Sequence, residues 1–183
     1  MSWIHMTSVL LIALALIFGQ SSLDLPRRWL GAQPDLLPSL MVYTSLSTGL
    51  PGVTALAILG GMGFDSLSAN PMGTSIMPLF LVGFTIERYR GLILQNQAYA
   101  QGILGLMASA AVPFLSVLML LNGPVAPLLG WGSLWQWLVM SLSGALAAPL
   151  WFWCFGRITH ALDYSPMPSP GYHRDRELKR GRG

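Results

Sequence analysis

Charged residues are scarce in this sequence: Asp, Glu, Lys and Arg make up only 9% of its 183 residues, whereas 53% are hydrophobic. Soluble domains usually carry about a quarter of charged residues, so this composition cannot cover a water-exposed surface. The charges are also clustered. His5 aside, residues 1–23 hold none, and residues 92–155 hold none at all. These stretches are expected to face lipid or one another.

Cysteine is limited to Cys154, which excludes an internal disulfide and paired cysteine ligands for a metal. His5, His160 and His173 are dispersed, so interface or solvent positions explain them better than metal binding does. The sequence contains no His-Glu-x-x-His, no Gly-x-Ser-x-Gly and no phosphate-binding loop. Its basic residues are not interleaved with aromatics as base stacking requires. We therefore expect no enzyme, no cofactor, no metal and no nucleic-acid partner.

The long apolar runs predict transmembrane helices. Lipid-facing backbone must satisfy its own hydrogen bonds, so membrane spans are helices or strands of a closed barrel, and barrel strands alternate apolar and polar residues. Runs such as LLIALALIF do not alternate. A cleaved signal peptide is the alternative for the N-terminus, but MSWIHMTS lacks Lys and Arg and no clear Ala-x-Ala site follows. The sequence predicts an all-α integral membrane protein that retains its first helix.

Turn signals divide the apolar sequence into six predicted spans. As one helix, the charge-free stretch 36–64 would extend about 44 Å, beyond the roughly 30 Å hydrocarbon core. The Gly-Leu-Pro-Gly run at 49–52 instead favours two short helices joined by a tight turn. We expect a compact transmembrane bundle within residues 1–160 and a basic, disordered cytoplasmic tail at 161–183. The predicted spans lie near residues 4–18, 36–49, 52–64, 74–90, 98–121 and 134–155.

Basic residues predict the orientation. Arg88, Arg90, Arg157 and the basic tail share one side of the membrane if two helices intervene, and the positive-inside rule makes that side cytoplasmic. Six helices place both termini there but leave Arg27 and Arg28 outside, against the rule. Five helices with an external N-terminus would repair this only by threading the overlong stretch as one span. We predict the six-helix arrangement.

Tryptophans support the last span. Trp135 and Trp153 are 18 residues apart, which in a helix is about 27 Å and places both indoles at headgroup level. Trp131, Trp137 and Trp151 either reinforce these two belts or pack inside the bundle.

An ionisable residue at membrane depth is costly, so Asp65, in the run GGMGFDS, is the natural functional candidate. The glycines allow another helix to approach closely. The alternative is that Asp65 lies at the interface and caps the next turn through its carboxylate, because Ser66, Ser68 and Asn70 follow.

Small residues four positions apart recur along the predicted helices, at the spacing that lets membrane helices touch through their backbones. One such pair alone is a weak signal, whereas four predict a compact bundle with one face left for a partner. The pairs are Ala15 and Gly19, Ala57 and Gly61, Gly105 and Ser109, and Gly144 and Ala148.

The segment ALAILGGMGFDSLSANPMGTSIMPLFLVGFTIERYR resembles the MreD family of bacterial rod-shape proteins. That family has a Gly-rich helix ending in Asp, a short turn with a Met-Gly or similar pair, and an apolar helix closing on basic residues. The chain length, QPDLLPSLMVY, SGALAAPLWFW and the basic tail are also similar, so the resemblance covers most of the chain. The Arg27-Arg28 loop and the Pro-rich end of the tail depart from the pattern. The matching positions are Gly60, Gly61, Gly63, Asp65, Met72, Gly73, Arg88 and Arg90.

The resemblance implies a non-enzymatic scaffold subunit of the cell-wall elongation machinery in the bacterial cytoplasmic membrane. MreD proteins partner MreC, a single-span protein with a periplasmic coiled coil and β domain. They act alongside the MreB filament, the RodA glycosyltransferase and its transpeptidase partner. The bundle would bind the transmembrane helix or membrane-proximal segment of MreC and help to maintain rod cell shape. The family positions from Gly60 to Arg90, Met72 aside, are thus candidate partner-binding or helix-packing residues.

A transporter subunit is the alternative. Substrate-binding S-components of energy-coupling-factor transporters are also six-helix membrane proteins of this size, and the resemblance to MreD implies a similar fold. Such a subunit would hold a small ligand near the outer leaflet. The outer loops offer only Trp29, Asp35, Asn70 and Asn122, which is a sparse set.

Overall fold

The computed structural model describes residues 3–22, 31–67, 71, 73–93, 97–121 and 130–162. These residues form six α-helices and one short 3₁₀ helix, with no strand among them, so the all-helical prediction is confirmed for the described chain. Each predicted span corresponds to one α-helix. The elements are α1 (Trp3–Ser22), α3 (Leu37–Ser47), α4 (Leu50–Leu67), α5 (Ile76–Arg88), η1 (Arg90–Leu92), α6 (Ala98–Leu121) and α7 (Trp131–Leu162).

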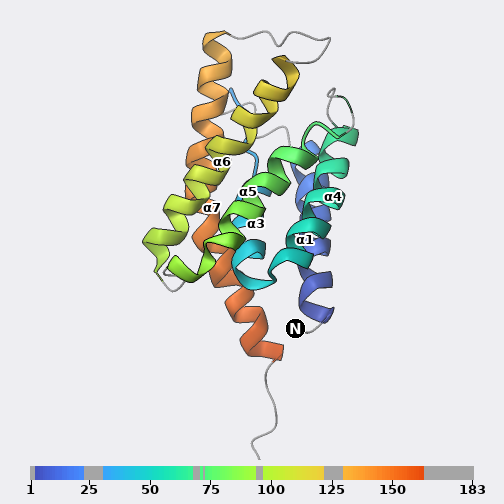
Figure 1. Ribbon diagram of the computed structural model, residues 1–183, viewed down its shortest axis with the longest axis vertical. Helices are drawn as coiled ribbons and strands as arrows, with labels where there is room; N and C mark the ends of the chain where they lie inside the picture. The colour runs from blue at the N-terminus through green and yellow to red at the C-terminus, as the bar shows by residue number, and fades with distance from the viewer. Residues whose placement is uncertain are drawn as a thin grey trace, which may run out of the picture.

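Successive α-helices run in opposite directions along the bundle (Figure 1). The start of α1 and the end of α7 therefore lie at the same end of the molecule, which we call the lower end. At the opposite, upper end, α6 and α7 extend beyond the tops of α4 and α5. The predicted tail at 161–183 falls outside the described residues except for the last two residues of α7.

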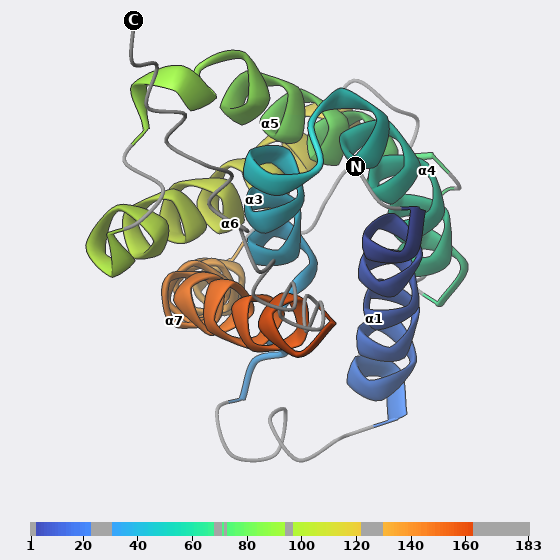
Figure 2. The same cartoon turned by 90° about the horizontal axis from the view of Figure 1, so that it is seen from below.

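The short helix α3 forms the centre of the bundle. Every residue from Leu37 to Leu46 is buried. Seen along the bundle, α3 is surrounded by α1, α4, α5, α6 and α7 (Figure 2). Polar side chains are tolerated in this position because they bond to their own helix: the hydroxyls of Thr44 and Ser45 donate to the carbonyls of Leu40 and Met41.

A two-residue turn separates α3 from α4, as the Gly-Leu-Pro-Gly run predicts. Gly49 has φ +72°, the left-handed conformation typical of a helix C-terminus. The Thr48 amide donates to the Thr44 carbonyl and closes the last turn. Pro51 then lies in the first turn of α4, where its missing N–H costs nothing. For this reason α4 begins at Leu50, two residues before the predicted start.

Among the described helices, three are long and apolar enough to cross a membrane, namely α4, α6 and α7. In α1 the apolar part is shorter, Met6–Gln20. The central α3 and the neighbouring α5 have 11 and 13 residues, which correspond to about 16 and 20 Å. The helix α7 is longer than predicted and runs over Trp131–Leu162, because Gly132 and Gly156, which flank the expected span, lie within the helix and do not end it.

Candidate functional site

The carboxylate of Asp65 builds the corner between α4 and α5. Its Oδ2 accepts backbone hydrogen bonds from Gly73 (2.8 Å) and Ser75 (3.2 Å). Ser75 is the N-cap residue of α5 but makes no cap bond with its own side chain. Asp65 is 2% exposed and thus supplies, from a neighbouring helix, an acceptor for amides at the start of α5. The carboxylate of Asp65 therefore caps the next turn, as the capping alternative predicts, and it does so from a buried position.

The second carboxylate oxygen of Asp65, Oδ1, is buried and has no hydrogen-bond partner among the described residues. A buried carboxylate with only half of its acceptors engaged is costly, and the two charge-assisted bonds to Oδ2 offset that cost. Gly73 has φ +97°, a conformation that L side chains rarely adopt. The turn between the two helices therefore depends jointly on Asp65 and Gly73.

The three glycines before Asp65 are each packed against a different helix. A Cβ atom on Gly61 would lie 2.9 Å from the Ile76 Cα, at the start of α5. On Gly60 it would lie 3.3 Å from Leu37 Cδ1 of α3, and on Gly63 it would lie 3.2 Å from Ile17 Cδ1 of α1. The glycine run is therefore a packing hub for α1, α3 and α5, as expected for close helix approach.

Arg88 and Arg90 lie apart from this corner, at the lower end of α5 and in η1. Both are exposed. Fifteen residues of mostly helical chain separate Gly73 from Arg88, which places them about 20 Å apart. The guanidinium Nη1 of Arg90 lies 3.5 Å from the position of a Cβ on Gly49, next to the C-terminal end of α3. The seven candidate positions thus form two groups, at opposite ends of the bundle, and not one site.

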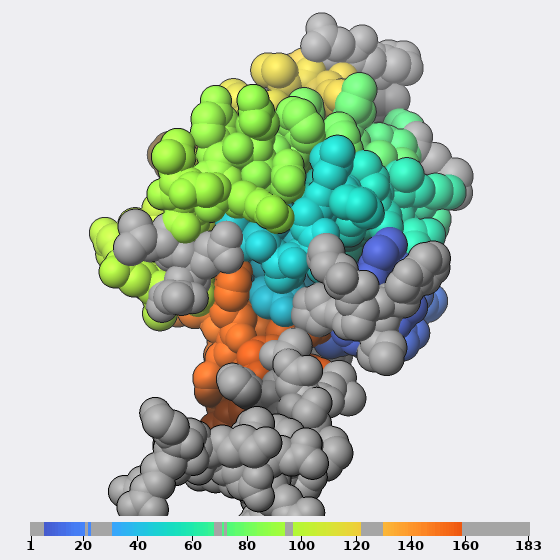
Figure 3. Space-filling view, turned by 60° about the horizontal axis from the view of Figure 1, so that its bottom comes forward, coloured from blue at the N-terminus to red at the C-terminus, as the bar shows by residue number. Residues whose placement is uncertain are grey.

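The surface view of the lower end shows the green segment of α5 and η1 adjoining the cyan turn between α3 and α4 (Figure 3). A cation at the C-terminus of a helix is favourable because the last carbonyls carry partial negative charge. Arg90 therefore has a structural explanation in its place beside α3, and Arg88, in the last turn of α5, is favoured by the carbonyls of its own helix.

Two of the small-residue pairs meet each other where α6 crosses α7. A Cβ on Gly105 would lie 2.6 Å from the Ala148 Cβ, and one on Gly144 would lie 2.5 Å from the Ser109 Cβ. The backbones of α6 and α7 are in contact there, as the four-residue spacing predicts. The pairs Gly105 and Ser109 and Gly144 and Ala148 are therefore confirmed as packing motifs.

The pair on α1 has no helix against it among the described residues. Ala15 is exposed, and a Cβ on Gly19 would meet no atom within 4 Å. Both residues line an open hollow of about 340 Å³ beside Gln33 and Leu36. Leu11 and Phe18 of the same helix are 66% and 61% exposed. This surface of α1, comprising Leu11, Ala15, Phe18 and Gly19, is called the α1 face below.

A chain of amide side chains that the sequence analysis did not single out ties α1 to α7 at the upper end. The Gln136 Nε2 donates to the Gln33 carbonyl (2.8 Å), and the Gln33 amide donates to Gln136 Oε1 (3.2 Å). The Gln33 Nε2 donates to the Gln20 carbonyl (2.7 Å). Gln136 is an amide side chain in the charge-free span of α7, and such a group requires a hydrogen-bond partner in apolar surroundings. Its presence was the sequence signal that could have predicted this contact.

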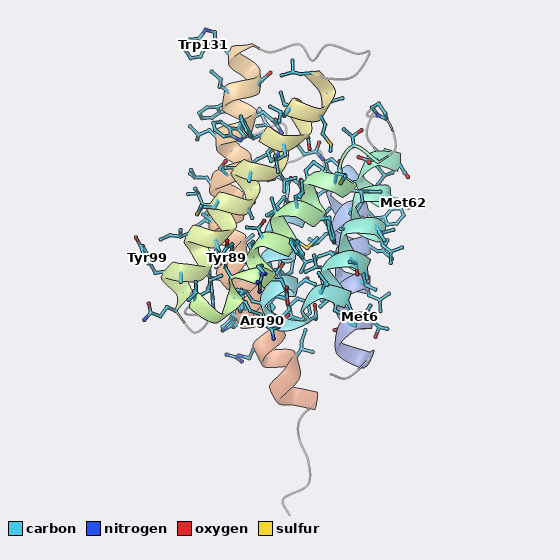
Figure 4. All side chains as sticks on the ribbon, in the orientation of Figure 1. Met6, Met62, Tyr89, Arg90, Tyr99 and Trp131 are labelled. Atoms are coloured by element: carbon cyan, nitrogen blue, oxygen red, sulfur yellow. The ribbon has the colours of Figure 1, made fainter. Side chains whose placement is uncertain are left out.

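The tryptophans of α7 differ in their contacts with the rest of the bundle. Trp135 and Trp153 lie on the same helix and are 51% and 60% exposed. By contrast, Trp151 Nε1 donates to Ser39 Oγ of the central helix (3.0 Å), and Trp137 Nε1 donates to the Ala110 carbonyl of α6 (2.9 Å). These two indoles are packing residues. Trp131 lies at the extreme upper end of α7, far from Arg90 near the lower end (Figure 4).

Potential catalytic and metal-binding groups do not converge in the described part of the chain. No three His, Cys, Asp or Glu residues there could hold one metal ion. Cys154 is half-buried on α7. His173 and the loop residues Trp29, Asn70 and Asn122 lie outside the described residues, as do Arg27 and Arg28.

The half-buried Asp35, just before α3, predicts a pH-dependent stability. Burial raises its pKa to about 6, against the lowering effect of the hydrogen bond from the Leu37 amide. Between pH 4 and 6 the folded state holds a proton that the unfolded state loses, so the free energy of unfolding falls as pH rises, by about 1–2 kcal/mol after allowance for partial exposure. Asp35→Asn should abolish this fall in detergent thermal melts recorded at pH 4.5 and 7. Glu87→Gln is the control, and a pH slope that persists in Asp35→Asn contradicts the assignment.

Comparison with family models, with curated proteins and with solved structures finds no match for this chain.

Proposed function

We propose that this chain is a multi-pass protein of the bacterial cytoplasmic membrane that acts as a non-enzymatic, MreD-like scaffold subunit of the cell-wall elongation machinery. It would bind MreC directly and, through MreC, join MreB, RodA and its transpeptidase partner in maintaining rod cell shape. The proposal rests on the resemblance of residues 55–90 to the MreD family, together with the way in which those residues are used in the fold.

The distribution of charge supports a membrane location with both termini on the cytoplasmic side. All described cations, Arg88, Arg90 and Arg157, belong to the lower end, where α5 and α7 finish. The described acids at the upper end, Asp35 and Asp65, have no cation beside them in sequence. Between the two ends, large apolar side chains are exposed along α6 and α7. Among the described residues this polarity agrees with the positive-inside rule for an even number of crossings, whereas Arg27 and Arg28, outside the described residues, depart from it.

The single observation that carries the scaffold proposal is that the glycines and the aspartate of the MreD-like motif make their contacts inside the bundle. Gly60, Gly61, Gly63 and Asp65 all make contacts inside the bundle, and none of them lines the three hollows formed by described residues beside α1, between α5 and α6, and between α6 and α7. A motif used in this way maintains the shape of a helix bundle, which is what a partner-binding subunit requires.

The α1 face is the proposed docking surface for the transmembrane helix of MreC. Of the four small-residue pairs, the pair on this face is the one where a Cβ added to the glycine would meet no described atom within 4 Å. A single-span helix seated there would gain backbone contact at Ala15 and Gly19, flanked by the exposed apolar side chains of Leu11 and Phe18. The proposed contact needs no charged residue.

A detergent pull-down with matched glycine variants tests this proposal. The tagged chain should retain MreC from native membranes, and Gly19→Leu should reduce the retained MreC about tenfold, because the added side chain separates the helices. Gly132→Leu is the control, since its Cβ would also meet no atom within 4 Å but lies on α7. Equal MreC recovery with both variants would exclude the α1 face. Absence of MreC from the wild-type eluate would exclude the scaffold function.

One observation favours the transporter alternative. A hollow of about 800 Å³ lies between the upper parts of α6 and α7, lined by Phe114, Trp131, Trp137 and Met140 among others. Its volume suits a small ligand. However, the polar groups of Gln136 and Trp137 are already engaged by Gln33 and Ala110, so few donors remain to orient a ligand. Co-purification of an ATP-hydrolysing module in the same pull-down, without MreC, would favour this alternative.

A further inference from the structure

A second hollow, between α5 and α6, is almost wholly apolar. Its volume is about 370 Å³, and it is open on one side. The lining includes Leu81 and Thr85 from α5, Tyr89 directly after it, and Leu104 and Ala111 from α6. The Thr85 hydroxyl is already satisfied by the Leu81 carbonyl. The walls therefore offer no free polar group until Tyr89, at the lower end of the hollow.

The volume of this hollow, about 370 Å³, suits an extended chain better than a helix. A packed α-helix has a diameter of about 10–12 Å and would need a longer and wider surface than a hollow of this size. The hollow exists because α6 packs closely on α7 through Gly105 and Gly144, leaving its opposite side more loosely packed on α5. An aliphatic chain fits such a site, since only apolar surface would be buried.

The lower end of the hollow carries positive charge. Arg88 continues the stripe of Leu81 and Thr85 at the spacing i, i+4, i+7, so it lies on the same side of α5 as one wall of the hollow. Arg88 is exposed, and the next residue, Tyr89, which lines the hollow, is 58% exposed. Tyr89 and Arg90 both lie toward the lower end of the bundle (Figure 4). Glu87 is half-buried next to them and reduces the local charge without cancelling it, because Arg90 follows.

We propose that this hollow is a binding site for an anionic phospholipid, with one acyl chain between α5 and α6 and the phosphate held by Arg88 and the Tyr89 hydroxyl. Basic positions between membrane helices on the cytoplasmic side commonly hold acidic lipid headgroups. The inference rests on the proposed membrane location but not on MreC binding. It can therefore fail while MreC is still retained in the pull-down, and it can hold if MreC is not.

Native mass spectrometry of the purified full chain tests the site. The chain is titrated with phosphatidylglycerol and, separately, with phosphatidylcholine of the same acyl chains. We expect phosphatidylglycerol to bind at least fivefold more tightly, and Arg88→Gln to remove about fivefold of its affinity, in line with roughly 1 kcal/mol for each cation near a phosphate. Ala111→Phe, which fills the hollow, should weaken both lipids.

The matched control is Arg157→Gln. It removes the same charge at the same end of the bundle, but from a guanidinium that lies 4.9 Å from the Trp153 ring centroid on α7. We expect it to leave phosphatidylglycerol binding within twofold of the wild type. Equal binding of the two lipids by the wild type would overturn the proposal, as would an equal loss in Arg88→Gln and Arg157→Gln. Retained binding in a folded Ala111→Phe variant would place the lipid elsewhere and overturn it too.

Discussion

Replacing Asp65 with alanine is expected to lower the free energy of unfolding by about 2–3 kcal/mol, because the amides of Gly73 and Ser75 lose a charged acceptor in a buried position. For a chain of this size the midpoint of thermal unfolding should fall by roughly 5–10 °C. Tryptophan fluorescence in detergent measures the transition, since the chain contains seven tryptophans.

Two further substitutions show whether the carboxylate acts as a cap. Asp65→Asn keeps one oxygen acceptor for the two amides, so it should be less destabilising than Asp65→Ala. Ser66→Ala is the neighbouring control: the Ser66 side chain is exposed and bonds only to the Met62 carbonyl of its own helix, so its loss should change stability by less than about 0.5 kcal/mol. If Asp65→Ala melts like the wild type, the corner between α4 and α5 is held by packing alone.

The same variants separate structure from partner binding. The Asp65 side chain is 2% exposed, so it cannot contact an MreC helix seated on the bundle surface. For the folded Asp65→Asn protein we therefore expect unchanged MreC retention per molecule, in contrast to Gly19→Leu.

Helix positions and close contacts were the most predictable part of this fold. In α4 the glycine run and Asp65 indicated a close approach followed by a turn, and both features lie there. The pairs on α6 and α7 were also predictable, because a spacing of four places small residues on one side of a helix. What the spacing could not predict was that these two pairs would face each other.

Contacts between segments far apart in the sequence were harder to predict. Gln33 and Gln136 are separated by 103 residues, and nothing local indicates that their amides meet. The same is true of Trp151 and Ser39, which made the choice between interface and packing roles for each tryptophan undecidable from spacing alone. The grouping of Asp65 with Arg88 and Arg90 as one candidate site followed the resemblance of this segment to the MreD family. However, an intervening helix places its two ends at opposite ends of the bundle.

Gly144→Ala is the second substitution expected to have a large effect. Alanine has the higher helix propensity, so an isolated α7 would gain up to about 1 kcal/mol from the change. In the bundle, the added Cβ would lie 2.5 Å from the Ser109 Cβ and 2.9 Å from the Gly105 carbonyl oxygen. Since the latter contact is with backbone, α6 and α7 must move apart, and overpacking of this kind costs roughly 1–3 kcal/mol.

Gly156→Ala provides the matched comparison on the same helix, because its Cβ would meet no atom within 4 Å. There the helix propensity should dominate, and the variant should be as stable as the wild type or up to about 1 kcal/mol more stable. We therefore expect the same substitution to change stability in opposite directions at the two positions. The thermal midpoints of both variants, measured in one detergent, show this. If both variants are stabilised, the α6–α7 crossing is not tightly packed. The explanation of the open hollow on the α5 side of α6 would then fail with it, since that hollow depends on α6 being held against α7.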